Sequence, residues 1–332
     1  MTATELTVPN AETPAPTTPT YVIGEADPTF PMRPSVLSRF LRIATAKGAG
    51  GTPPFAAVDI VHARTEGGAV VSSFHRDRGS KFAVRVEQFI NGPTGADFEC
   101  AVAQGQWLLD YLDSGIFADE YALAVRYSND AVPKVHLTNG VRSVSTPAQT
   151  AEGTVLRPSQ KDGYGLSPDA FWVSSDPAKR PEPSAAWPVW AERGYSVATV
   201  PLSEVETVLA AGSALVAHQY EPQVEVVFNG DGTVRVSVID PKRADGDSVD
   251  LAAVPGARVL ADVADRYSLL FGNVEPFLRS ILSVKTDRLY LVHHRGETRM
   301  NVAAVERDAT GALSLRVTQT FATQKDAALA KK

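Results

Sequence analysis

The sequence predicts an α+β fold with antiparallel sheets, built from a repeated unit in which strands follow a helix. Apolar residues first recur at helical spacing and then alternate with polar residues, and the same order returns later in the chain. At 332 residues, 44% of them hydrophobic, the chain is long enough for two cores of about 100–200 residues each. We therefore expect two domains.

The first repeat begins with an amphipathic helix over residues 35–47. Pro34 suits its first turn, and the glycine-rich segment 48–51 ends it. Its apolar face consists of Val36, Leu37, Phe40, Leu41 and Ala44. From Phe55 the apolar period falls to two, which predicts three strands with glycines at the turns. These strands are expected at 55–64, 69–74 and 81–90.

The second repeat starts with an extended segment at 98–103. The apolar cluster 107–112 follows it and suits a short helix. Further strands are expected at 121–127, 134–137 and 141–145. Cys100 is the one cysteine and lies in the extended segment, which predicts a buried, unreactive thiol and excludes an internal disulfide or a multi-cysteine metal site.

Composition divides the chain. Residues 1–19 are rich in Thr, Pro and Ala and lack the apolar area to pack, so we expect a disordered tail. Residues 147–193 are rich in Pro, Ser, Lys and Asp, which is typical of a linker or insertion. The first domain then spans 20–146 and the second 194–323, and residues 324–332 are expected to fray.

The second domain starts the unit again, with an extended segment at 195–200 and a helix at 201–211. Strands at 223–228 and 233–239 flank Asn229-Gly230-Asp231-Gly232, a hairpin signal because Gly and Asn tolerate positive φ. A further strand is expected at 248–253. The last repeat is expected as a strand plus helix within 258–271, a helix at 274–281, and strands at 288–293, 299–306 and 313–320.

Charge and composition narrow the class of protein. The formal net charge is −6, so a broadly basic surface that adheres to nucleic acid is excluded, and any DNA contact must come from a local basic stripe. The N-terminus lacks the basic and apolar segments of a signal peptide, and no apolar run reaches the ~18 residues of a membrane span. We expect no membrane partner and a cytoplasmic location, in a bacterial or phage-infected bacterial cell.

No motif predicts catalysis. In Lys47-Gly48-Ala49-Gly50-Gly51 the lysine precedes the glycines, which reverses the order of a phosphate-binding loop. His293 and His294 are adjacent on an expected strand near Asp287, so their side chains point to opposite faces and cannot easily hold one metal ion. We assign no nucleophile, acid–base pair, metal or cofactor, and expect a protein that is not an enzyme.

Three stretches carry a recognisable pattern. SVLSRFL at 35–41 leads into the first strands, FECAVAQGQWLLDYL covers 98–112, and SVATVPLSEVETV covers 196–208. These resemble, in order, the opening helix and hairpin of a DNA polymerase sliding clamp domain, its second strand–helix step, and the start of the following clamp domain. The family is that of the bacterial polymerase III β subunit, and a divergent or phage two-domain form would fit.

This resemblance implies the DNA clamp fold, with antiparallel sheets outside and two helices per domain on the inner face. The bacterial subunit has three such domains and this chain has room for two, so a six-domain ring implies a homotrimer. It further implies a replication processivity factor that encircles double-stranded DNA through sequence-neutral phosphate contacts and has a DNA polymerase and a clamp loader as partners. The alternative is a phage virion structural protein, a tail or capsid component, which would also be β-rich, acidic and poor in cysteine.

The candidate DNA-binding residues are basic side chains on or beside the expected helices. They are Arg33, Arg39, Arg42, Lys47 and Arg279. The first four form a stripe off the apolar face of the helix at 35–47, and the other stands alone on the helix at 274–281. An ordinary solvated helix face is the alternative explanation of this stripe. Lys161, Lys179 and Arg180 belong to the linker, where we expect a solvated loop.

Overall fold

The computed structural model describes 23–45, 58–77, 82–102, 105–118, 120, 122–150, 195–218, 221–228, 234–240, 242, 249–250, 265–286, 288–294 and 299–322. The expected tail 1–19, the frayed end 324–332 and most of the linker 147–193 lie outside these residues. So do Lys47, Asp287 and the turn at 229–232.

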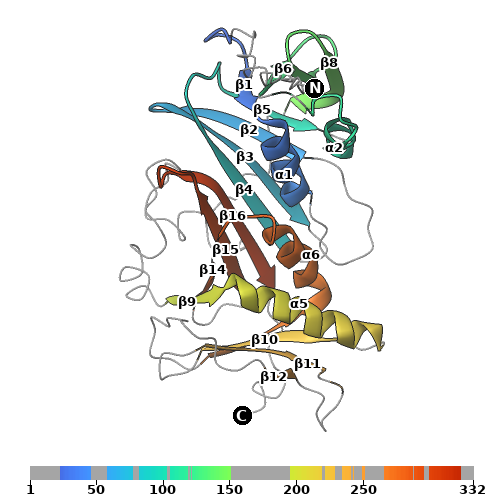
Figure 1. Ribbon diagram of the computed structural model, residues 1–332, viewed down its shortest axis with the longest axis vertical. Coiled ribbons are helices and arrows are strands. Elements are labelled where there is room, and N and C mark those ends of the chain that lie inside the picture. The colour runs from blue at the N-terminus through green and yellow to red at the C-terminus, as the bar shows by residue number, and fades with distance from the viewer. Residues whose placement is uncertain are drawn as a thin grey trace, which may run out of the picture.

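The chain repeats one unit, a strand, a helix and three strands, four times (Figure 1). The first half contains β1(Thr29–Met32), α1(Pro34–Ala44), β2(Val58–Thr65), β3(Gly68–Asp77), β4(Phe82–Asn91), β5(Phe98–Val102), α2(Gly105–Asp113), β6(Leu123–Ser128), β7(Lys134–Thr138) and β8(Ser143–Thr150). The second half contains β9(Tyr195–Pro201), α5(Leu202–Ala217), β10(Gln223–Phe228), β11(Val234–Ile239), β12(Val249–Asp250), β13(Asp265–Leu270), α6(Phe271–Ile281), β14(Arg288–His294), β15(Arg299–Arg307) and β16(Leu313–Ala322).

The strands form two sheets with antiparallel pairing. A 12-stranded sheet has the order β1-β6-β7-β8-β5-β2-β3-β4-β16-β15-β14-β9, and a four-stranded sheet has the order β12-β11-β10-β13. The four-strand groups of the halves have the same order, since β1-β6-β7-β8 corresponds to β9-β14-β15-β16, and β5-β2-β3-β4 to β13-β10-β11-β12. The two groups differ in how they are joined, because β8 pairs with β5 in the first half whereas β16 pairs with β4. Each half is therefore one copy of the same double repeat.

The two halves are joined by a β-ladder. Strand β4 pairs with β16 over six residue positions, from Leu315 opposite Gln88 to Thr320 opposite Ala83. Across this ladder the buried Arg316 donates from Nε to Glu87 Oε2 at 2.6 Å, and its guanidinium lies 5.2 Å from the centroid of the Phe89 ring. A backbone ladder with a buried ion pair across it makes the junction part of the folded sheet.

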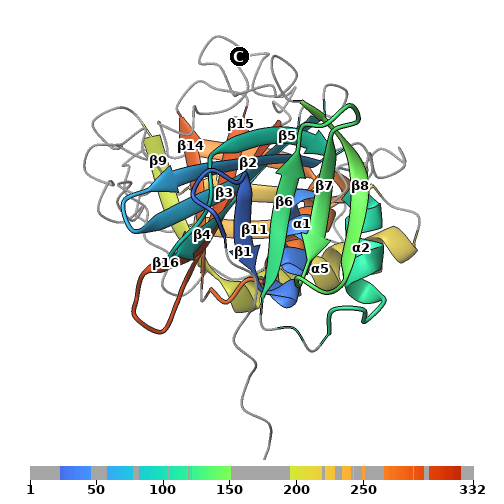
Figure 2. The same ribbon diagram turned by 90° about the horizontal axis from the view of Figure 1, so that it is seen from above.

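The helices lie in one row on one side of the strands, in the order α2, α1, α6, α5 (Figure 1). The view down the long axis places α1, α2 and α5 together and β9, β14 and β15 on the other side (Figure 2). Apolar spacing explains this arrangement. In α1 the side chains of Phe40 and Leu41 are buried, and in α5 Val208 and Leu209 take the same places in the helix.

The predicted fold class is confirmed, and several boundaries change. Pro201 precedes α5, which continues to Ala217, beyond the expected end at 211. The strand β8 runs through Thr150, so the connecting segment begins later than the expected residue 147. Pro147 fits within this strand because Ala148 donates to Pro133 across the ladder to β7, and the missing N–H of Pro147 falls on the other edge. Strand β1 was not predicted.

Candidate nucleic-acid interface

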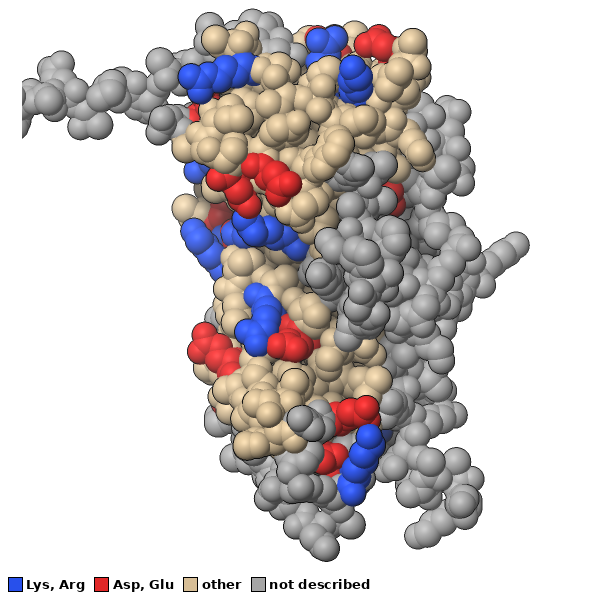
Figure 3. All heavy atoms as spheres, turned by 90° about the vertical axis from the view of Figure 1, so that its right-hand side faces the viewer, with Lys and Arg blue, Asp and Glu red and all other residues tan. Residues whose placement is uncertain are grey.

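The four-helix face, made of α2, α1, α6 and α5, is the candidate interface because it gathers one helix from each repeat. Neighbouring helices contact one another along the row, including α1 with α6 across the junction between the halves. The side of the molecule seen in Figure 3 has basic and acidic groups next to one another down its length. Any anion that approaches this face meets charges of both signs.

The four helices are not basic as a set. They contain three arginines, Arg39, Arg42 and Arg279, against five carboxylates, Asp110, Asp113, Glu204, Glu206 and Glu275. The carboxylates are concentrated on α2 and α5, whereas α1 carries no acid. An electrostatic attraction to DNA on this face is therefore confined to α1 and to one position of α6.

Arg42 lies on the exposed surface at the seam between α1 and α2. Its guanidinium Nη2 donates to both carboxylate oxygens of Asp113, at 2.7 and 2.6 Å, and its Nε donates to Ser38 at 3.3 Å. The Arg42 and Asp113 side chains are 57% and 46% exposed. The arginine is accessible to a ligand but already holds an anionic partner.

Arg279 occupies the matching seam in the second half, between α6 and α5. It donates from Nε and Nη2 to Glu275 Oε1, at 2.9 and 2.7 Å, and from Nη2 to Ser213 on α5 at 3.2 Å. Its side chain is 57% exposed. Each half therefore has one exposed arginine at the seam between its two helices, and each of these arginines is paired with a carboxylate.

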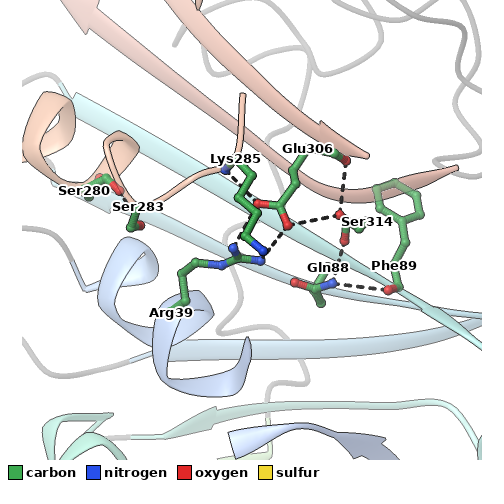
Figure 4. A network of polar contacts seen from close by, with 8 residues as sticks. All are labelled: Arg39, Gln88, Phe89, Ser280, Ser283, Lys285, Glu306 and Ser314. Atoms are coloured by element: carbon green, nitrogen blue, oxygen red, sulfur yellow. Dashed lines mark hydrogen bonds and ion pairs between the residues drawn. The ribbon is translucent and has the colours of Figure 1, made fainter. Parts of the chain in front are cut away.

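Arg39 has a different environment from the one expected. Its guanidinium forms a two-point ion pair with Glu306 of β15, with Nη1 to Oε2 at 2.9 Å and Nη2 to Oε1 at 3.1 Å (Figure 4). The two side chains are only 18% and 9% exposed, because α1 packs against the second half at this point. Arg39 thus contributes to the junction between the halves. We had expected it in the DNA-contacting stripe, and we now assign it to this junction instead.

The Arg39–Glu306 pair belongs to a larger polar network (Figure 4). The backbone N–H of Lys285 also donates to Glu306 Oε2, at 2.9 Å, and the Ser314 hydroxyl lies 3.4 Å from Oε1. Gln88 of β4 donates to the carbonyl of Ser314. Residues from both halves therefore satisfy the buried carboxylate together.

The remaining candidates are less well defined. Arg33 precedes α1 as its exposed N-cap residue, without a side-chain cap hydrogen bond, and it has interactions with other groups. Lys47 lies outside the described residues. The structure therefore keeps Arg42 and Arg279 as accessible arginines on the four-helix face, and Arg33 at its border.

Sequence reasoning missed the carboxylates that pair with these arginines. Glu275 and Arg279 are four residues apart on one helix, a spacing that predicts their pairing from the sequence alone. Asp113 and Glu306 are distant from their partners in sequence, by 71 and 267 positions, and only the packing of α1 brings them together.

Three titratable groups whose pKa values are shifted mainly by burial lie close together in the first half, on β2 and β5. Burial and the neighbouring Glu99 raise the pKa of Asp59 to about 6, and burial followed by nearby carboxylates raises that of the Cys100 thiol to about 12. Burial lowers the pKa of His62, whose ring stacks 5.3 Å from Phe30. The predicted buried thiol is confirmed. Within the described ranges no three His, Cys, Asp or Glu side chains form a metal-ligand group.

An apolar cavity of about 50 Å³ lies inside the second half, between its two sheets and the helices α5 and α6. Val205, Val236, Leu278 and Met300 are among the residues that line it. It belongs to the core of this half. No helix of the described chain is both long and apolar enough to cross a membrane.

The fold is that of DNA polymerase sliding clamps. No family model and no curated protein sequence matches the chain, so the likeness rests on structure. Clamp structures from Pseudomonas aeruginosa, Bacillus subtilis and Thermotoga maritima match it with TM-scores of 0.55, 0.57 and 0.53.

The Pseudomonas and Thermotoga structures are described as the DNA polymerase III β subunit. Sequence identities are 11, 10 and 13% for the three structures in the same order. The matches cover 93, 92 and 95% of this chain and 69, 66 and 70% of the respective clamp chains. This chain thus has the clamp fold over about two thirds of the length of those chains.

Proposed function

We propose that this protein is a DNA sliding clamp, a processivity factor that encircles duplex DNA without catalysing a reaction. The observation that carries the proposal is the four-fold repeat, whose helices form one row on one side of the sheets. That arrangement suits a wall of a ring with helices toward the DNA. It also separates this proposal from the virion alternative, in which sheets would pack as sandwiches with a peripheral helix.

The ring would form from three copies. Since two halves of this chain correspond to two thirds of the length of the bacterial clamp chains, three copies supply the six domains of a clamp ring. The junction inside the chain suggests how copies meet. It is the β4–β16 ladder, and in the repeat β12 is the equivalent of β4 and β8 is the equivalent of β16. Among the described strands, one edge of β12 and residues 143–147 on the outer edge of β8 have no paired strand. We propose that these edges pair between copies.

Contact with DNA would be made to phosphates and would be independent of sequence. Arg42 and Arg279 are accessible on the four-helix face, and Arg33 lies beside it. With two such arginines per chain on described helices, and carboxylates nearby, the grip on DNA would be weak and salt-sensitive. A DNA polymerase and a clamp loader are the proposed partners, in the bacterial cytoplasm or a phage-infected cell.

Retention on circular DNA tests the proposal. Light scattering should give a mass near three times the 35.5 kDa chain, and protein loaded onto nicked circular DNA should stay bound in a salt wash and leave when the circle is cut. A strictly monomeric protein at micromolar concentration counts against the self-closing ring. Equal loss from circular and linear DNA under every loading condition, including with a clamp loader, contradicts the clamp function itself.

A further inference from the structure

The exposed arginines of the four-helix face have similar partners. In each half, the arginine lies at the seam between the two helices and is paired with a carboxylate, which is Asp113 on the neighbouring helix for Arg42 and Glu275 on the same helix for Arg279. Each guanidinium also donates a hydrogen bond to a hydroxyl, Arg42 to Ser38 and Arg279 to Ser213. In both halves, therefore, an exposed arginine at the seam has one carboxylate and one serine as partners, although the helix that supplies each partner differs.

Asp113 is poorly placed for a structural role alone, whereas Glu275, with a side chain that is 29% exposed, is intermediate. The Arg42 and Asp113 side chains are about half exposed, and exposed ion pairs contribute little to stability. The junction pair Arg39–Glu306 differs, since its side chains are mostly buried and tied to a network. The Arg42–Asp113 pair should therefore open most easily, the Arg279–Glu275 pair less easily, and the Arg39–Glu306 pair least easily.

We propose that Asp113 and Glu275 are tuning residues that compete with DNA phosphates for Arg42 and Arg279. A phosphate oxygen and a carboxylate oxygen bind the same guanidinium N–H groups, so a phosphate must displace the carboxylate before it is bound. The carboxylate then recaptures the arginine when the phosphate moves on. This inference rests on the proposed clamp function and adds to it a device that keeps each contact brief, which suits movement along the duplex.

The expected size of the effect follows from the exposure of the pairs. Freeing one arginine from its carboxylate should tighten binding to a short duplex about 1.4- to five-fold per site in each chain, which corresponds to the ~0.2–1 kcal/mol of such pairs. The salt dependence should also steepen, because a freed arginine neutralises a phosphate more fully, by up to ~0.9 in the log–log slope per contact.

The experiment compares Asp113→Asn, Glu275→Gln and the double variant with the parent, by fluorescence anisotropy on a short linear duplex over a range of salt concentrations. Asp110→Asn is the matched control. Asp110 is also exposed on α2, but it accepts from Gln106 at 3.0 Å, so its replacement removes one negative charge without freeing an arginine. A second control places Asp113→Asn in an Arg42→Ala background.

We expect Asp113→Asn to tighten binding more than Asp110→Asn, and the excess to disappear in the Arg42→Ala background. Equal effects of Asp113→Asn and Asp110→Asn, or an excess that persists without Arg42, would overturn the inference, since general charge removal would then suffice. This failure is distinct from that of the clamp function. If the parent protein is retained on circular DNA and Asp113→Asn and Asp110→Asn behave alike, the clamp function stands and only the tuning role of the carboxylates is refuted. If the parent protein is never retained, alone or with a loader, both the clamp function and the tuning role are refuted.

Discussion

Replacing Arg39 with methionine should destabilise the fold and leave the DNA contact almost unchanged. Methionine keeps an apolar stem but leaves Glu306, 9% exposed, without its two-point partner. Breaking a fully buried pair costs about 3–5 kcal/mol, and the partial exposure of Arg39 reduces this to about 2–3 kcal/mol. The backbone N–H of Lys285 and the hydroxyl of Ser314 still donate to the carboxylate, which limits the loss further.

Urea unfolding of a double-mutant cycle measures this effect. Arg39→Met, Glu306→Gln and the double variant should give a coupling energy of about 1–2 kcal/mol, because the two side chains touch directly. The matched control is Arg42→Met, whose pair with Asp113 is exposed and should contribute no more than ~1 kcal/mol. If Arg39→Met costs no more than Arg42→Met, or if it alone flattens the salt slope of DNA binding, our assignment of Arg39 to the junction is wrong.

Three further predictions concern stability. Asp59→Asn should stabilise the protein by on the order of 1 kcal/mol at pH 8, because the raised pKa of Asp59 means that its ionised carboxylate is disfavoured in the folded state. The full pKa shift corresponds to ~3 kcal/mol, and the partial exposure of the side chain reduces this value. This gain should shrink as the pH falls through 6 and vanish below about 4, in urea titrations at each pH; a gain independent of pH would contradict it. Because the pKa of His62 is lowered in the fold, the parent protein should lose stability as the pH falls from 6.5 towards that pKa. His62→Phe should remove this loss of stability at low pH, and a variant with the same pH profile as the parent would contradict the prediction. Gly212→Ala should destabilise the protein by about 1–3 kcal/mol in thermal or urea unfolding, because the added Cβ would overlap the buried Phe271 ring. This loss should outweigh the higher helix propensity of alanine. A stabilised variant would show that α5 and α6 can move apart.

The sequence pattern was sufficient for the elements whose apolar period is unbroken. The strands at 223–228 and 134–138 and the helix at 34–44 have clear alternation or a helical face, and the structure has them close to the predicted limits. The pattern failed for β1, where Thr29–Met32 has only four residues, follows Pro28 and contains Pro31. This strand exists because Phe30 packs in the core against His62 and because β6 pairs with it, which local propensity cannot reveal.

The candidate site was less predictable than the fold. Positions off the apolar face of α1 were read from helical spacing, and this reading holds for Arg42, which is exposed. It fails for Arg39, because the second half of the chain covers that side of the helix, and spacing within one helix contains no information about what packs on it. The carboxylate partners depend on the same long-range packing, apart from Glu275.

The shared sheet has a mechanical consequence. Since β4 and β16 are joined by backbone hydrogen bonds and by the buried Arg316–Glu87 pair, bending one half against the other would require several of these bonds to break together. The two halves should therefore move as one rigid segment under load. If the protein closes around DNA as a trimer, the ring should open only at its three contacts between chains. A loader that opens the ring would therefore have to separate one of those contacts and could not open it by bending a chain.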